Sequence, residues 1–389
     1  MNPEILGISD EEFSFLTSFR AFLKKEIQPI AFDKSVPIDH AYIQKFASVG
    51  YTGLLHEETY GGSASSVYFS ILLIEALSEV CGSSFFSIGA SVGLFGKPIA
   101  LFGSLEQKQT FLPKIIRGEW IGCLGITEAQ SGSDVLSIET NCKEIRPGEF
   151  LLNGSKTYIT NAPSADYAII LANLFVGPSQ NSESKGLTHF LVNLNSPGVS
   201  KGQPMAKMGL HKSPTGELFF EDVLLEKNSV VGGVGKGFRQ TMNTFNMERL
   251  SIAAYCLGVC NACLRESILF SKTRKSFGKT INKHQSVGNL LAEIYTKTEA
   301  IRAFTYQIAK EMDLSNSGVK ITNLSQRCAS VKLLASEFAR EVTNLAVQIH
   351  GGAGFMDEYL VSNLYRDIRL AEIGGGTSEI QKQIIAGSL

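Results

Sequence analysis

The 389-residue chain lacks the sequence signatures of the common nucleotide-binding folds. It has no GxGxxG motif after a strand, which argues against a Rossmann dinucleotide site. The stretch Phe277-Gly-Lys-Thr280 resembles the end of a P-loop, but Thr273 stands where that loop needs its first glycine and no strand precedes it. A GxSxG nucleophile elbow is also missing. These absences exclude a P-loop and an α/β-hydrolase site.

Histidine and cysteine are too few and too scattered to indicate a metal centre. The six histidines show no HExxH or other ligand spacing, and the seven cysteines include a single CxxC pair, Cys260 and Cys263. Together with Cys256, this pair repeats at helical spacing in an apolar run. We therefore interpret these cysteines as small core residues in a reducing compartment, and we expect no metal.

The chain has little excess charge of either sign. Its net charge of -1 gives no reason to expect nucleic acid or an anionic membrane as a partner. We expect no apolar run to reach a membrane-spanning length. The stretch Met1-Asn-Pro-Glu-Ile5 resembles neither a secretory signal nor a transit peptide, so the expected compartment is the cytoplasm.

The pattern of apolar residues predicts helices, then strands, then helices again. Ser9 and Glu12 are spaced like a capping box, and further helices are expected over 67–80, 84–102 and 106–116, the second of these buried on all sides. Short β-type runs follow Trp120, with a turn expected at Asn153-Gly154. These runs are 121–126, 150–152, 168–174, 190–194 and 218–223. The predicted domains are 1–120 (helical), 121–237 (β) and 238–389 (a helical bundle).

Glycine is concentrated near the C-terminal end, in the segment from Gln348 to Gln381. One cluster contains Gly351 and Gly352, and a second is Gly374-Gly-Gly376. Glycine lets backbone approach a bulky ligand or adopt turns with positive φ. The clusters therefore indicate either a cofactor held by backbone or a pair of helix caps.

Several stretches, taken in order along almost the whole chain, resemble the acyl-CoA dehydrogenase family. No single motif is specific, but their order and spacing are. They are Glu58-Thr-Tyr-Gly-Gly62, Gly125-Ile-Thr-Glu128 with Ser131-Gly-Ser-Asp134, Asn153-Gly-Ser-Lys156 with Tyr158-Ile-Thr-Asn161, Arg274-Lys-Ser-Phe-Gly-Lys279, and the C-terminal segment described above.

The resemblance implies an α+β fold with an N-terminal helical domain, a small central β-barrel or sandwich domain and a C-terminal four-helix bundle. It also implies FAD bound without a Rossmann fold, an acyl thioester substrate, and electron-transfer flavoprotein or O₂ as electron acceptor. Members of the family form homodimers, commonly paired into tetramers, in which two subunits contact each flavin.

The chemistry implied by the resemblance needs one buried carboxylate as base. It removes the α proton of the thioester while hydride leaves the β carbon for the flavin. Many members place this base immediately before the Gly-Thr of the C-terminal motif, where this chain has Gly375. Isovaleryl- and long-chain-type members use a glutamate in a Glu-Arg-Leu context, which matches Glu248-Arg-Leu250. We therefore predict Glu248 as the base; the alternative is an ordinary solvated helix face.

The resemblance also assigns binding roles by position. Asn246, Arg249 and Gly375, together with Ser133, match substrate-side positions, although many members have aspartate at the site of Asn246. The threonines and the tyrosine among the cofactor residues could equally be ordinary strand residues. The matched cofactor positions are Thr127, Ser133, Tyr158, Thr160, Arg274, Phe277, Gln285, Gln348, Gly351, Gly352, Thr377 and Glu379.

The sequence leaves three functions open. The first is dehydrogenation of an acyl-CoA, and the second is the same reaction, or oxidation, on an acyl or aminoacyl group (for example prolyl) bound to a carrier protein. The third is an O₂-using flavin oxidase or monooxygenase. The glycine at position 375 also suggests a protein without catalytic activity, against which an intact Glu248 argues.

Overall fold

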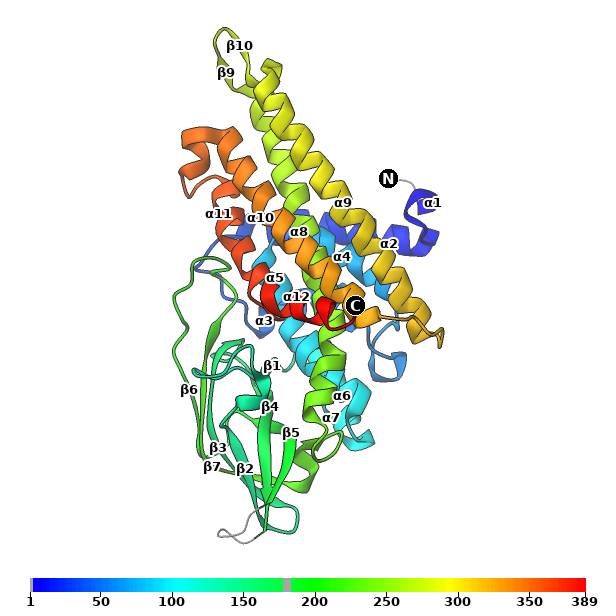
Figure 1. Ribbon diagram of the computed structural model, residues 1–389, viewed down its shortest axis with the longest axis vertical. Coiled ribbons are helices and arrows are strands. Elements are labelled where there is room, and N and C mark those ends of the chain that lie inside the picture. The colour runs from blue at the N-terminus through cyan, green and yellow to red at the C-terminus, as the bar shows by residue number, and fades with distance from the viewer. Residues whose placement is uncertain (1–2, 178–182) are drawn as a thin grey trace.

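The computed structural model describes residues 3–177 and 183–389, and it consists of a helical body with a β domain at one end (Figure 1). The N-terminal third is helical, with short 3₁₀ and π segments such as η5 (Ala90–Gly96) between the helices. The helices are α1 (Pro3–Leu6), α2 (Asp10–Phe22), α3 (His40–Ser48), α4 (Val67–Ser78), α5 (Gly82–Gly89), α6 (Lys97–Phe102) and α7 (Leu105–Ile116).

Local sequence signals explain how several of these helices begin. Ser9 and Glu12 form the predicted capping box, in which the Ser9 hydroxyl accepts from the Glu12 amide at 3.1 Å and the Glu12 carboxylate accepts from the Ser9 amide at 2.9 Å. The expected helix over 84–102 is present as α5, η5 and α6. The prediction that it is buried on all sides was wrong, because Leu101 is 51% exposed.

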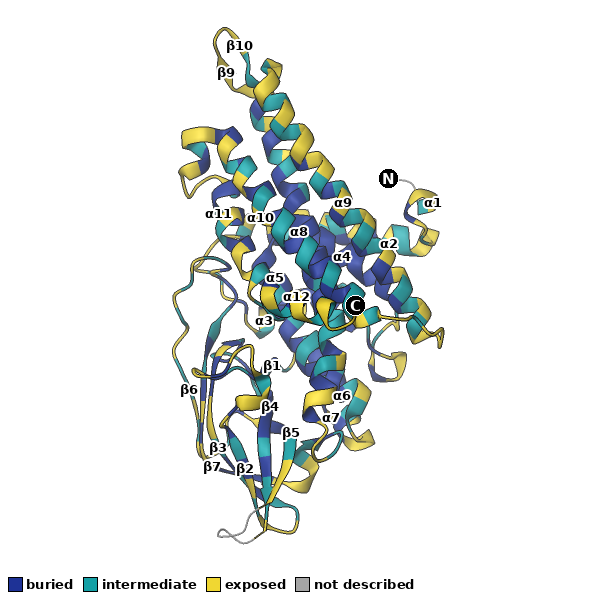
Figure 2. Cartoon of the chain, in the orientation of Figure 1, coloured by how far each residue is buried: buried dark blue, intermediate teal, exposed yellow. Residues whose placement is uncertain are grey.

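Two helical stretches, 82–102 and 237–273, are long and apolar enough to cross a membrane, which corrects the expectation that no run has this length. Length and composition are weak evidence, because core helices share them. Here 50% and 67% of the most apolar window of each is buried inside the protein. Figure 2 shows buried residues along much of α8, as in a helix at the centre of a core.

The β domain is one mixed sheet with strand order β6-β7-β3-β2-β4-β5-β8 and β1 paired with β4. Residues 167–170 of β4 pair in parallel with β1, and residues 173–175 pair in parallel with β2, so two short strands share one edge of β4. The strands are β1 (Gly122–Gly125), β2 (Asn141–Arg146), β3 (Glu149–Thr160), β4 (Tyr167–Val176), β5 (Glu183–Asn193), β6 (Val199–Lys201), β7 (Thr215–Glu226) and β8 (Val230–Val231).

The turn expected at Asn153-Gly154 does not exist, and this prediction was wrong. Both residues lie inside β3, where the register against β7 shifts between Leu152 and Gly154. Gly154 has φ +134, and a Cβ there would lie 2.7 Å from the Thr140 backbone. The glycine therefore marks a bulge with close backbone approach, which is the alternative origin of an Asn-Gly pair.

The C-terminal part is a bundle built on α8 (Gly237–Thr273), α9 (Gln285–Asn316) and α10 (Leu324–His350). α11 (Leu360–Asp367) and α12 (Ser378–Ala386) pack against α10, and α4 of the N-terminal part packs against α8 and α9. A small hairpin of β9 (Lys275–Ser276) and β10 (Lys279–Thr280) connects α8 to α9 at the end of the molecule far from the β domain (Figure 1).

Candidate active site

The start of α8 is fixed against the β domain by a buried histidine. His189 of β5 contacts the Gln240 side chain at 3.0 Å through Nδ1 and the Thr241 hydroxyl at 2.9 Å through Nε2. Burial lowers the pKa of His189 to about 4, so the ring is neutral at pH 7. Further along the helix, Phe245 packs against a β-domain cluster that contains Ile126. These contacts set which face of α8 points toward the site.

That face presents Glu248 to the second glycine cluster. A Cβ added to Gly375 would lie 3.5 Å from Cδ and 3.6 Å from Oε1 of Glu248, and 2.6 Å from Cδ1 of Ile252. Gly375 itself has φ +64, a conformation that favours glycine. The structure thus brings Glu248 and Gly375 together from opposite ends of the bundle sequence, and the carboxyl is not on a solvated helix face.

The Glu248 carboxyl is buried and incompletely bonded. Its Oε2 has no hydrogen-bond partner among the described residues. Burial raises the pKa of Glu248 to about 7, while the positive charges of Arg249 and Lys332 act in the opposite direction. A carboxyl with this pKa can both hold and release a proton near neutral pH.

The turn opposite Glu248 is held by side chains that the sequence interpretation missed. Lys332 of α10 donates to the Gly376 carbonyl at 2.8 Å, and Gln381 of α12 donates to the carbonyls of Gly375 and Gly376 at 3.1 and 2.8 Å. Both side chains are fully buried. A sequence signal for Lys332 exists, since it is a lone charge in the apolar run from Cys328 to Ala335.

Two predicted substrate residues lie beside Glu248 on α8. Arg249 is buried, and its guanidinium donates to the Asn246 side chain at 2.9 Å while Nε has no partner in the parts of the chain that the structure describes. Asn246 in turn donates to the Ser325 hydroxyl at 2.9 Å, which joins α8 to the start of α10. Asn246 therefore orients Arg249, and the Nε–H group of this arginine has no acceptor in the described chain.

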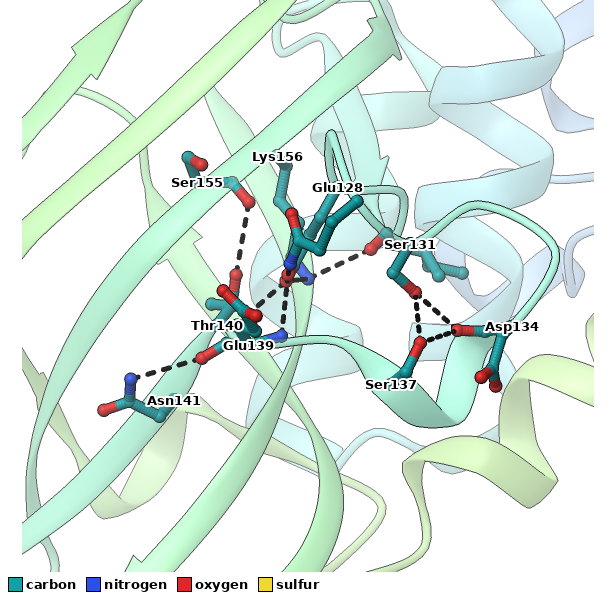
Figure 3. A network of polar contacts seen from close by, with 11 residues as sticks. Glu128, Ser131, Asp134, Ser137, Glu139, Thr140, Asn141, Ser155 and Lys156 are labelled. Atoms are coloured by element: carbon teal, nitrogen blue, oxygen red, sulfur yellow. Dashed lines mark hydrogen bonds and ion pairs between the residues drawn. The ribbon is translucent and has the colours of Figure 1, made fainter.

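The loop that carries Thr127 is fixed by a buried ion pair (Figure 3). Lys156 donates to Glu128 at 2.7 Å and to the Ile126 carbonyl at 3.0 Å, so it holds the residues on both sides of Thr127. Glu128 also accepts from the backbone amides of Glu139 and Thr140 at 2.7 and 3.0 Å. Burial alone would raise the pKa of Glu128, but these hydrogen bonds lower it to about 2. Sequence analysis gave this pair no role.

Tyr158 and Thr160 lie beside Thr127, at the adjoining end of β3. The Thr157 amide donates to the Thr127 carbonyl at 2.9 Å, which ties β3 to this loop. Tyr158 has φ +58 in a break of the strand register and its side chain is 68% exposed. Positive φ is unfavourable for a tyrosine, and such strain often accompanies a functional site. This placement differs from that of an ordinary strand tyrosine.

Ser133 is exposed in the loop after Glu128, between Ser131 and Asp134, which Figure 3 shows. The loop is closed by the Ser131 hydroxyl, which donates to the Asp134 carbonyl, and by the Ser137 hydroxyl, which donates to that carbonyl at 3.0 Å. These bonds give a fixed, solvent-facing position to Ser133 although its own side chain is free of them.

Most of the remaining predicted cofactor residues lie at the opposite end of the bundle. Arg274 follows α8 directly, and the distance from Glu248 to Arg274 along the helix is about 40 Å at 1.5 Å per residue. Phe277 is 94% exposed at the tip of the hairpin. This remote group, all of it exposed, comprises Arg274, Phe277, Gln285, Gln348, Gly351 and Gly352. One copy of the chain therefore does not bring it to Glu248.

Thr377 and Glu379 lie between these groups, at the start of α12. The Thr377 hydroxyl caps the helix by accepting from the Ile380 amide at 3.3 Å, and Glu379 is exposed in the first turn. Because Thr377 directly follows the Gly375–Gly376 turn, its cap also fixes the turn that faces Glu248.

The described residues fit a flavin in two respects. The Thr127 loop and the end of β3 offer the exposed Tyr158 ring and the Thr127 and Thr160 hydroxyl groups, and Ile126 of this loop lies in the cluster on which Phe245 of α8 packs. At the other end, a Cβ on Gly351 or Gly352 would have no atom within 4 Å in the described ranges, so the backbone there is open to a ligand. Both regions match positions that the sequence resemblance assigns to FAD.

Comparison with protein families covers nearly the entire chain. Residues 9–119, 123–223 and 235–389 match the N-terminal, middle and C-terminal domains of acyl-CoA dehydrogenases, respectively. The chain is 34% identical over 372 residues to a 3-(aryl)acrylate reductase of Clostridium sporogenes, which covers 95% of this chain and 96% of the relative. It is 34% identical over 388 residues to a mitochondrial isovaleryl-CoA dehydrogenase of Oryza sativa, covering 99% and 92%.

Solved structures agree. A butyryl-CoA dehydrogenase of Megasphaera elsdenii superposes with a TM-score of 0.90 at 33% identity, covering 98% of both chains. A prolyl acyl carrier protein oxidase, AnaB, superposes with a TM-score of 0.89 at 28% identity, covering 97% of this chain and 98% of that one. An acyl-CoA dehydrogenase of Bacillus anthracis in complex with FAD gives 0.90 at 28% identity, covering 100% of this chain and 68% of that one. The chain therefore belongs to the acyl-CoA dehydrogenase family of FAD-dependent oxidoreductases acting on CH–CH bonds.

Proposed function

We propose that this protein catalyses FAD-dependent α,β-dehydrogenation of an acyl-CoA thioester with Glu248 as the catalytic base. The observation that carries the proposal is the buried Glu248 carboxyl, with one oxygen unbonded among the described residues, facing the space left by Gly375. A glutamate side chain at position 375 would compete with Glu248 for the substrate's α carbon. With glycine at this position, Glu248 has no such competitor.

Glu248 accepts the α proton of the thioester at a carboxylate oxygen. Its pKa of about 7 means that a substantial fraction is ionised at neutral pH and that burial makes it a stronger base than an exposed glutamate. The bound FAD supplies the acceptor for the β hydride. Thr127, Tyr158 and Thr160 hold the flavin side of the site, and the fixed loop at Glu128 keeps them in place.

On the substrate side, Arg249 has a buried N–H without an acceptor in the described part of the chain. Such a group is costly unless a ligand satisfies it, so we propose that Arg249 and Ser133 hold the arm of the thioester. Asn246 orients Arg249 through the hydrogen bond at 2.9 Å. Gly375 adds no side chain beside the Glu248 carboxyl.

The remote group around Arg274 would complete the flavin site of a second copy. Its residues are exposed, and Arg274 at the end of α8 lies about 40 Å along the helix from Glu248. The 94% exposed ring of Phe277 and the guanidinium of Arg274 suit a cofactor with aromatic and phosphate groups, respectively. We accordingly propose a homo-oligomer in the cytoplasm, with electron-transfer flavoprotein or O₂ as acceptor.

A carrier-protein thioester is the second candidate substrate. The likeness to a prolyl acyl carrier protein oxidase supports it, and the reacting end of both thioesters is the same. A carrier protein is acidic and would prefer a basic rim at the site entrance.

The test is anaerobic mixing of the FAD-loaded protein with a panel of acyl thioesters, in CoA and carrier-protein form, while flavin absorbance is followed. We expect bleaching with at least one CoA ester, and a rate about 10²–10⁴ lower in Glu248→Gln. Glu266→Gln, on the same helix but paired with Arg265 at 3.2 Å, is the matched control and should react normally.

Normal bleaching by Glu248→Gln with full flavin content would remove Glu248 from the mechanism. Bleaching by carrier-protein esters alone would favour the second candidate substrate. Rapid reoxidation in air would indicate O₂ as the acceptor.

A further inference from the structure

Lys332 is a buried cation next to the site, to which neither the sequence resemblance nor the chemistry above assigns a task. Its side chain has 0% exposure, which is rare for lysine. The ammonium has three hydrogens, and it donates to the Gly376 carbonyl at 2.8 Å. Gly376 directly follows Gly375, on which an added Cβ would lie 3.5 Å from Glu248 Cδ, so the lysine is bonded to the turn that forms the wall of the site.

The titratable groups around Glu248 and its two cationic neighbours come from three elements. The charged ones are Arg249 on α8, Lys332 on α10 and the exposed Glu379 on α12, which acts on Lys332. The buried thiols of Cys256 on α8 and Cys328 on α10 are neutral near pH 7, because burial raises the pKa of each to about 12. Of these groups, only Arg249 and Lys332 lower the pKa of Glu248. Arg249 is bonded to the Asn246 side chain and Lys332 to the Gly376 carbonyl, so both cations have an uncharged acceptor.

Burying a lysine without a full partner is unfavourable, and burial indeed lowers the pKa of Lys332 to about 8. A carbonyl alone could be satisfied by a neutral donor, and Gln381 already donates to Gly376 at 2.8 Å. The positive charge at this place therefore needs an explanation other than hydrogen bonding to the turn.

We propose that Lys332 is a positioning residue for Glu248: it fixes the Gly375–Gly376 turn against the carboxyl and supplies positive charge that favours the ionised base. The inference rests on the proposed role of Glu248 but concerns its protonation, which can be measured without turnover. No atom of Lys332 takes part in the reaction.

The test is an infrared pH titration of the buried carboxyl on the FAD-loaded protein. The band of Glu248 is the one that disappears in Glu248→Gln, which separates it from Asp367, the carboxyl whose pKa burial raises to about 6. We expect a midpoint near 7 in the natural protein. In Lys332→Met and Lys332→Gln the midpoint should rise by about 1 pH unit, since a nearby opposite charge is lost.

Two further variants, together with Lys332→Gln, separate charge from architecture. Lys332→Gln keeps a donor but no charge, whereas Lys332→Arg keeps the charge and should stay close to the natural midpoint. Lys212→Met removes another buried lysine, bonded to the Ile30 carbonyl, and should leave the midpoint unchanged. The neutral Lys332 variants should also reduce flavin about fivefold more slowly at pH 7, because the ionised fraction of Glu248 falls from about one half to about one tenth, and the loss should be recovered at higher pH.

The proposal fails if both neutral variants titrate like the natural protein, or if neither of them folds, because Lys332 would then be structural only. If Lys332→Met alone fails to fold, Lys332→Gln decides. Failure of the proposed function looks different: Glu248→Gln would then bleach normally whatever residue occupies position 332.

Discussion

Two buried glutamates, Glu128 and Glu248, show how the same side chain serves opposite purposes. Glu128 accepts from Lys156 at 2.7 Å and from two backbone amides, and these bonds bring its pKa down to about 2 despite burial. Glu248 has an oxygen without a partner in the described chain, and burial brings its pKa up to about 7. Saturated bonding makes one carboxylate a permanent charge, whereas missing bonds make the other a titratable group.

This difference in pKa distinguishes a structural residue, Glu128, from a residue suited to proton transfer, Glu248. Glu128 binds Lys156, which also donates to the Ile126 carbonyl, so this pair fixes the backbone on either side of Thr127 and its charges must not change during the reaction. Glu248 faces the space at Gly375, and a base must change its charge. Both residues are glutamates, so charge alone does not distinguish them.

The largest expected effect comes from breaking the satisfied pair. Lys156→Met leaves Glu128 buried without its cation, which should lower the free energy of unfolding by about 3–5 kcal/mol. Urea unfolding measures this change. Arg146→Met, which removes an exposed pair with Glu149, is the control and should cost less than about 1 kcal/mol. Equal costs for the two variants would mean that the buried pair has no special role.

Filling the space opposite Glu248 should have the next largest effect. Gly375→Ala combines a positive φ of +64 with a Cβ only 2.6 Å from Ile252, and we expect a loss of about 2–3 kcal/mol in unfolding free energy. Gly318→Ala has φ +95 with no atom within 4 Å in the described structure, so it isolates the backbone cost. Adding Ile252→Val should recover part of the difference; if the two alanine variants are equally stable, crowding is unimportant.

The pH dependence of flavin reduction should distinguish the two carboxylates. Because the base must be ionised, the rate should fall about tenfold per pH unit below 7 and level off above it. A titration of Glu128 would place the break near 2 instead. Stopped-flow measurements across this range report the midpoint. Asp367→Asn should leave it in place, and a midpoint that moves with Asp367 would assign it to that carboxyl.

The smallest expected effect is that of Glu248→Gln on stability. The pKa of about 7 in the folded protein lies above the pKa of an unfolded glutamate, so the neutral Glu248 carboxyl stabilises the folded state at low pH. This stabilisation is lost as the pH rises through 7. In thermal unfolding we expect the variant to gain stability relative to the natural protein as the pH rises from 5 to 8, where the natural Glu248 becomes charged. A variant that is less stable at both pH values would mean that Glu248 is satisfied in the fold.

Local signals predicted much of the framework. The capping box at Ser9 predicted the start of α2, and the spacing of apolar residues predicted α4 and α7. The family resemblance predicted how these helices pack together. Strands β2, β6 and β8 were missed because they are short or partly polar, and their pairing supplies what their composition does not. The Asn153-Gly154 pair was misread because one dipeptide suits both a hairpin turn and a bulge. The predicted domain limits and site roles remain predictions.

The sequence by itself determined the order of helical and β regions and the lack of a nucleotide loop. It also indicated that the catalytic base is Glu248, because glycine stands at position 375, where many relatives have a glutamate. Only the tertiary structure showed that Glu248 and Gly375 face each other and that Lys156 is paired with Glu128. It also showed that Lys332 donates to the Gly375–Gly376 turn. The physical reason is that a side chain's pKa and bonding depend on burial and on neighbours distant in the chain, whereas periodicity and capping depend on residues a few positions apart.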